Sequence, residues 1–226
     1  EEIKSPLLAL TSFASFSNGS KINELMKLLQ ASIEKHRTVY QEFLQVSFYD
    51  FEFSVRNCLV GIDAYSNDEE KFDAVREPAM YDNFLSVYEH YGKGKFFGQF
   101  GAEHVYQASC DTDYFKKHSG RFAISLQSEG SPVSGRVCTV LYTYENCFRM
   151  DGEGSRPISE NTFLKENLKP LCGSAGLTIF DLGAEGSPFT ESPIFIKSPS
   201  SDSTLDYFQY IVLIRNSEAC TLYKTA

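Results

Sequence analysis

The first part of the chain repeats apolar residues with a helical period. Apolar stripes cover residues 48–62 and 72–87, and an earlier stripe begins after Ser20, which can cap a helix. Pro78 lies inside the last stripe, and we expect it to kink or restart that helix because proline lacks a backbone donor. The pattern predicts a mostly helical segment over residues 1–92. The apolar positions of the earliest stripe are Ile22, Met26, Leu29, Ile33, Tyr40 and Phe43.

The rest of the chain changes to short aromatic and β-branched segments separated by turns. These segments predict strands at 96–100, 122–126, 139–144, 177–182 and 208–214. The run Tyr210–Ile214 is continuously apolar, as is typical of a strand covered on both faces in a parallel sheet. Short helices fit between the strands at 113–118 and 160–171. We therefore expect an α/β fold with a mainly parallel sheet flanked by helices, in which a helical layer or cap (1–92) and an α/β sheet region (93–226) form one structural unit.

Composition narrows the classes of partner. The chain carries 30 acidic and 21 basic residues, a net charge of −9, which repels nucleic acid and anionic membrane surfaces. We therefore expect no nucleic-acid partner and no membrane partner. No apolar run approaches the length of a membrane span, and no secretion signal is recognisable. The six cysteines lack zinc-site spacing. Buried free thiols are the favoured interpretation, with one or two disulfides as the alternative.

The missing secretion signal and the free thiols predict a cytoplasmic location. The chain opens on Glu1-Glu2-Ile3, so we also expect a processed chain or an excised domain.

The segment that ends at His104 is the main candidate for chemistry. Ligands of open α/β sheets gather beyond the carboxyl ends of strands, and His104 follows the strand predicted over 96–100. It could serve as a general base or as a metal ligand, and a structural hydrogen bond is the alternative. Glu103 can assist only if the chain has already turned out of the strand, because neighbouring strand residues point to opposite faces.

Three further polar residues interrupt apolar patterns. Arg76 and Asn83 are two helical turns apart, which would place both on the buried face around Met80. A buried cation needs a carboxylate or an opening to water. We interpret Arg76 as fixing a carboxylate or an oxyanion, whereas the alternative is an arginine that extends to solvent around Pro78. Asp181 lies in an apolar predicted strand, and it either lines the same site or simply ends the strand.

Two common catalytic patterns are missing from the sequence. There is no Gly-x-Ser-x-Gly motif that would carry a serine nucleophile. There is also no phosphate-binding loop, since Gly92-Lys-Gly-Lys is not followed by serine or threonine.

The order Arg76-Glu-x-x-Met80-x-x-Asn83, then Gly-Lys, then a segment ending in His104, resembles the second half of the erythromycin esterase-like superfamily. That superfamily is related to TraB/TIKI-like and ChaN-like proteins, and the likeness covers residues 20–226. It implies hydrolysis of a small-molecule ester or lactone by water, with no metal and no cofactor. By this likeness His104 is the general base and Arg76 a catalytic partner. In the hydrolase hypothesis that follows, Glu103 would be a catalytic helper, and Asn83 and Asp181 would bind substrate.

Two departures from the family pattern leave an alternative open. The family carries two histidines three residues apart here, and Gly101 stands in place of the first. The family's Gly-Glu-x-x-His motif occurs nowhere in this chain. A lone histidine cannot hold a catalytic metal, which needs about three protein ligands. The alternative is a non-catalytic ligand-binding or protein-interaction domain that keeps the fold but lacks the complete site.

Overall fold

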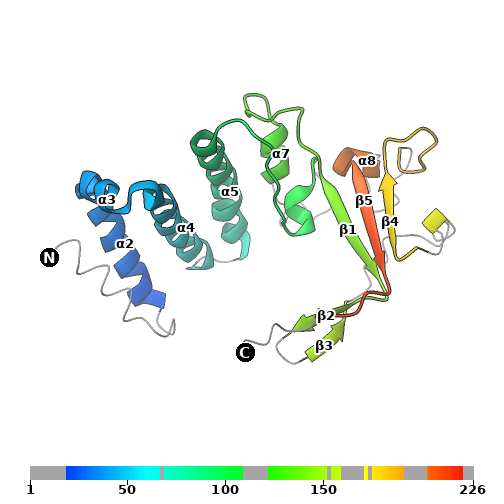
Figure 1. Ribbon diagram of the computed structural model, residues 1–226, viewed down its shortest axis with the longest axis horizontal. Helices are drawn as coiled ribbons and strands as arrows, with labels where there is room; N and C mark the ends of the chain where they lie inside the picture. The colour runs from blue at the N-terminus through cyan, green and yellow to red at the C-terminus, as the bar shows by residue number, and fades with distance from the viewer. Residues whose placement is uncertain are drawn as a thin grey trace. The chain divides into compact units, whose positions relative to one another are not determined.

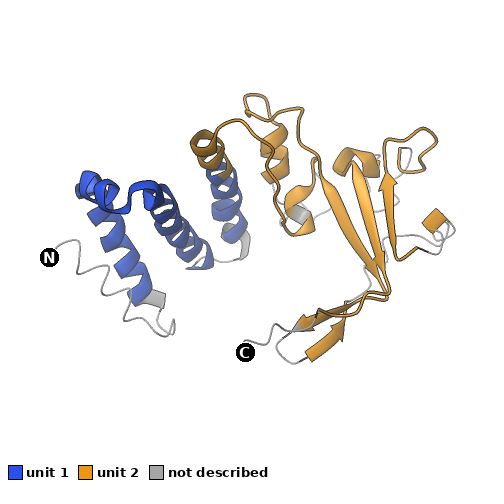
Figure 2. Ribbon diagram, in the orientation of Figure 1, with its two compact units in different colours: residues 1–83 blue, residues 84–226 orange. Residues whose placement is uncertain are grey.

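The structure is a computed structural model, and the chain divides into two compact units (Figure 2). We call residues 1–83 the helical unit and residues 84–226 the sheet unit. The structure describes residues 19–66, 69–108, 122–151, 154–158, 171–172, 175–190 and 203–220.

The described part of the helical unit consists of helices (Figure 1), which confirms the mostly helical N-terminal part. The stripe that begins after Ser20 is divided at His36, a residue with non-helical backbone angles (φ −119°, ψ 31°). Phe43 consequently lies outside the core and is 80% exposed, so its assignment to the buried stripe was wrong. The elements are α2 (Gly19–Lys35), α3 (Arg37–Leu44), the 3-10 turn η1 (Gln45–Ser47), α4 (Phe48–Ser66) and α5 (Glu69–Tyr91), which runs through Pro78 without restarting and continues into the sheet unit.

The core of the helical unit comes from residues close in sequence. The Ser32 and Tyr40 hydroxyls share a buried hydrogen bond of 3.1 Å. Outside this core, the exposed Arg37 pairs with Glu52, and this contact raises the pKa of Arg37. The buried cluster consists of Leu29, Ile33, Tyr40, Phe48 and Val55.

The sheet unit is built on a small mixed sheet. Strand β5 (Tyr210–Arg215) is central, with β1 (Val140–Glu145) parallel on one side and β4 (Leu177–Asp181) antiparallel on the other (Figure 1). Strands β2 (Phe148–Asp151) and β3 (Gly154–Pro157) form an antiparallel pair. The described strands therefore give a mixed fold, and the parallel part is the β1–β5 pair.

Two of the predicted strands are wrong. Residues 122–126 lie in a helix, α7 (Phe122–Gln127), which buries Phe122, Ala123 and Leu126 at helical spacing. Residues 96–100 form neither helix nor strand. Short apolar runs do not distinguish a strand from a buried helix segment, and that ambiguity produced the first error.

The aromatic side chains of 96–100 explain the second error. The Phe96 ring centroid lies 5.7 Å from that of Phe84 and 5.7 Å from that of Tyr88, both on α5. The Phe100 ring lies 4.9 Å from that of Phe122. Ring packing against helices, rather than sheet pairing, therefore accommodates these phenylalanines. The helix predicted at 113–118 lies outside the described residues, as does all of the helix predicted at 160–171 except Leu171, which lies in a 3-10 turn.

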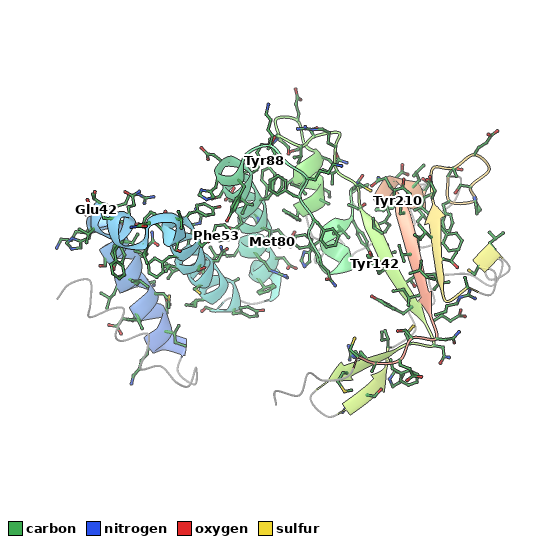
Figure 3. All side chains as sticks on the ribbon, in the orientation of Figure 1. Glu42, Phe53, Met80, Tyr88, Tyr142 and Tyr210 are labelled. Atoms are coloured by element: carbon green, nitrogen blue, oxygen red, sulfur yellow. The ribbon has the colours of Figure 1, made fainter. Side chains whose placement is uncertain are left out.

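The two faces of the sheet differ. Ile211, Val212 and Leu213 of β5 are all buried, as expected for this continuously apolar strand. One face of the sheet, through Leu141 and Ile211, forms a buried cluster with residues outside the strands. These residues are Tyr106, Leu182, Phe189, Tyr207 and Phe208. On the other face the flanking strands expose Val140, Tyr142, Leu177 and Ile179. Figure 3 labels Tyr142 on β1 and Tyr210 on β5.

The described cysteines divide into buried and exposed groups. Cys147 and Cys172 are buried, as expected, and burial raises the pKa of the Cys172 thiol although Arg215 partly opposes the shift. Cys58, Cys138 and Cys220 are exposed instead. Cys110 lies outside the described residues.

Candidate functional site

His104 lies on a single turn of 3-10 helix, η2 (Ala102–Val105), and not at the end of a strand. The chain is extended at Gly101 (φ −60°, ψ 148°) and then turns, so that the His104 amide donates to the Gly101 carbonyl at 3.1 Å. The turn removes the strand geometry that would have pointed Glu103 and His104 to opposite faces. The side chain of Glu103 is outside the described residues.

The imidazole of His104 is half-buried, and its Nδ1 atom is buried. A Cβ atom placed on Gly101 would lie 3.5 Å from Cδ2 and 3.9 Å from Nε2 of His104, which is ordinary van der Waals contact. A side chain at position 101 would therefore adjoin the His104 ring.

The residues after His104 are attached to the edge of the sheet. Tyr106 belongs to the sheet core, and its ring lies 5.8 Å from that of Tyr207 and 5.3 Å from that of Phe208. The Gln107 amide donates to the Tyr207 carbonyl at 3.3 Å. Tyr207 and Phe208 precede β5, so this attachment is at the amino ends of the parallel strands. The sequence predicts His104 after the carboxyl end of a strand, and this prediction is wrong because 96–100 is not a strand.

Asp181 reaches the same edge from the other side of β5, since it is the last residue of the antiparallel strand β4. The next residue, Leu182, donates its amide to the Gln209 carbonyl at 3.0 Å. Asp181 itself pairs in register with Tyr210, whereas the core face carries Phe180 and Ile211. Its exposed carboxylate accepts a hydrogen bond from the Gly183 amide at 3.1 Å. The observed contact thus stabilises a turn at the strand end.

Arg76 and Asn83 lie on α5 in the helical unit, where both are half-buried. The Arg76 guanidinium lies 5.5 Å from the centroid of the Phe72 ring. The Asn83 side-chain amide donates to the side-chain carbonyl of Asn57 on α4. The amide therefore joins two helices of its own unit. His104 and Asp181 belong to the sheet unit.

Sequence reasoning missed Glu77, which is only 3% exposed. A buried carboxylate is costly unless other groups compensate it, so Glu77 is a further candidate functional residue. Its position directly after Arg76 was the sequence signal that could have identified it. Sequence reasoning also missed a cluster of side-chain amides where β1 and β5 begin. No local sequence pattern indicates it, and its members are Gln107, Gln127 and Gln209.

Among the described residues, no group of three or more histidine, cysteine, aspartate or glutamate side chains is placed to hold a metal ion. Within the same residues, no helix combines the length and the apolarity needed to cross a bilayer. A comparison with known proteins finds no family model, no curated protein and no solved structure that matches this chain.

Proposed function

We propose that this chain is a hydrolase of small-molecule esters or lactones, erythromycin esterase-like, with His104 as its general base. The observation that carries the proposal is the setting of His104. It is a half-buried imidazole on a tight turn, with Nδ1 buried and the following residues attached to the sheet core. A general base must be held in a defined position and must keep access to the proton that it removes. The proposed family relation also carries the expectation of a mainly parallel sheet. In the described sheet β1 pairs with β5 in parallel, whereas β4 pairs with β5 antiparallel.

In the proposed reaction, neutral His104 accepts a proton from a water molecule as the water oxygen bonds to the carbonyl carbon of the substrate. The carbon–oxygen single bond of the ester or lactone then breaks, and the alkoxide leaving group takes up the proton held by His104. The products are a carboxylic acid and an alcohol, or one hydroxy acid from a lactone. Within the sheet unit, Asp181 is proposed to orient the substrate and Glu103 to assist His104.

The test is hydrolysis of a panel of neutral esters and lactones by the purified chain, with and without a chelator. His104→Asn should lower kcat about 10²- to 10⁴-fold, the usual contribution of a general base. His90→Asn is the matched control, because His90 is an exposed histidine at the end of α5. The kcat of His90→Asn should equal that of the wild type, and the chelator should change the kcat of neither of these two proteins. Full turnover by His104→Asn would contradict the proposal.

The second candidate function is a non-catalytic ligand-binding or protein-interaction domain. The observation that favours it is the exposed apolar face of the sheet, where Tyr142 is 51% exposed and Ile179 is 60% exposed. Exposed apolar patches of this kind commonly mark interaction sites. No turnover by either the wild type or His104→Asn, with both proteins folded, would favour this function over the hydrolase.

A further inference from the structure

The side-chain amides of Gln107 and Gln209 form a reciprocal pair. Nε2 of Gln107 donates to Oε1 of Gln209 at 2.8 Å, and Nε2 of Gln209 donates to Oε1 of Gln107 at 2.9 Å. The two residues are 102 positions apart in the sequence, and both are partly buried. Each amide thus serves the other as donor and as acceptor.

The remaining hydrogen-bonding capacity of Gln107 is also used. Its Nε2 donates to the Val137 carbonyl at 3.3 Å, and its Oε1 accepts from Nε2 of Gln127 on α7 at 3.1 Å. A glutamine amide offers two donor hydrogens and two acceptor lone pairs, so Gln107 is fully satisfied here. Such a network fixes one orientation of the side chain, because any other orientation would lose several hydrogen bonds together.

The Gln209 side of the pair is attached to the starts of both parallel strands. Its Oε1 accepts from the backbone amide of Thr139 at 2.8 Å, immediately before β1. Its own backbone amide donates to the Thr139 carbonyl at 3.1 Å, immediately before β5. The pair therefore holds the segment after η2 to the edge where β1 and β5 begin.

We propose that Gln107 and Gln209 are positioning residues for His104. The proposal rests on the proposed function, since it assigns the pair to the same site. His104 is three residues before Gln107, and the backbone between them is held by Tyr106 in the core and by the Gln107 amide on Tyr207. Loss of the pair removes the side-chain hydrogen bonds of Gln107 to Val137 and Gln209, which leaves the end of this segment with fewer restraints, and the imidazole then loses its fixed orientation. Misplacement of a catalytic group by about 1 Å is enough to cost roughly 10²-fold in rate.

The experiment records the Cε1–Hε1 signals of the histidines by NMR in the full chain, with the His104 signal identified by its loss in His104→Asn. Gln209→Met removes the amide and keeps a side chain of similar length. It should shift or broaden the His104 signal and leave that of His36 unchanged. Leu213→Val is the control, because Leu213 is a buried residue of β5 outside the amide cluster. It should leave the His104 signal where it is in the wild type.

A second variant covers the case in which Gln209→Met does not fold. Gln107→Glu keeps the acceptor for Gln209 and Gln127 but loses both donated bonds, and it should also shift the His104 signal. A folded variant whose His104 signal matches the wild type overturns the proposal, as does an equal shift in Leu213→Val. In the hydrolysis assay, kcat should fall at least about tenfold with KM within about twofold. A shifted signal in a chain without turnover would support the positioning and contradict the hydrolase.

Discussion

The helical unit and the sheet unit differ in how far apart in the sequence their contacting core residues lie. The buried cluster of the helical unit spans only Leu29 to Val55, whereas that of the sheet unit joins Tyr106 to Ile211. Hydrogen bonds follow the same division. Ser32 and Tyr40 are eight residues apart, and Gln107 and Gln209 are 102 apart. Local periodicity can specify the first kind of core, but the second kind depends on contacts that no window of sequence contains.

The largest expected effect is in the sheet unit. Phe208 is fully buried in the sheet core, so Phe208→Ala should lower the free energy of unfolding by about 3–5 kcal/mol. Hydrogen exchange with mass spectrometry should show faster exchange in peptides covering 140–145 and 210–215, with peptides of the helical unit as the internal reference. Phe97→Ala is the matched control, since Phe97 is 89% exposed, and its effect should stay within about 0.5 kcal/mol. Equal acceleration in both units would break the comparison of two separate cores.

A smaller effect is expected in the helical unit. Tyr40→Phe keeps the buried ring but removes the hydroxyl that bonds Ser32, and it should cost about 0.5–1.5 kcal/mol. Chemical denaturation followed by circular dichroism at the helix band measures this difference. Tyr65→Phe, at an 82% exposed position, should be close to neutral. If the two variants had the same midpoint, the Ser32–Tyr40 bond would make no net contribution to the helical core.

The smallest effect is expected at the surface of the helical unit. Glu52→Gln removes the ion pair with the half-exposed Arg37 and should cost less than about 1 kcal/mol. The cost should decrease as salt is added, because salt screens exposed charges. Thermal unfolding at low and high ionic strength measures it, with Glu42→Gln as the exposed acidic control. A salt-independent cost would show that packing of the Glu52 stem, and not its charge, is responsible.

The sequence predicted the helical unit well because helical periodicity is a local signal. It placed Leu29, Ile33 and Tyr40 on one buried face. It failed at Phe43, because the helix is interrupted at His36 and the later residues no longer follow the same face. For the sheet, the apolar run 210–214 was enough to predict a buried strand, but not its central position. The direction of β4 could not be predicted, since strand direction is set by how the connections return to the sheet.

The candidate site shows the same division. The motif predicted a chemical role for His104, which stays a prediction. It gave no signal for the turn at Gly101, because the segment 96–100 packs its Phe96 and Phe100 rings on helices and is not a strand. Asn83 was placed correctly on a helix, but its hydrogen bond to Asn57 joins two helices and had no sequence signal. The amide pair at the sheet edge was equally invisible, because its members come from opposite ends of the sheet unit.

The central position of β5 has a consequence for synthesis of the chain on the ribosome. Its partner β1 ends at Glu145, but β5 begins only at Tyr210. At about 5–20 residues per second, β1 waits roughly 3–13 s for the strand that completes it. During that interval the helical unit is already synthesised, while Leu141, which is buried in the folded sheet, has no β5 neighbour to cover it. The nascent chain therefore passes through a stage in which the helical unit can fold while β1 exposes apolar residues and unpaired backbone groups. We expect a chaperone to act at this stage.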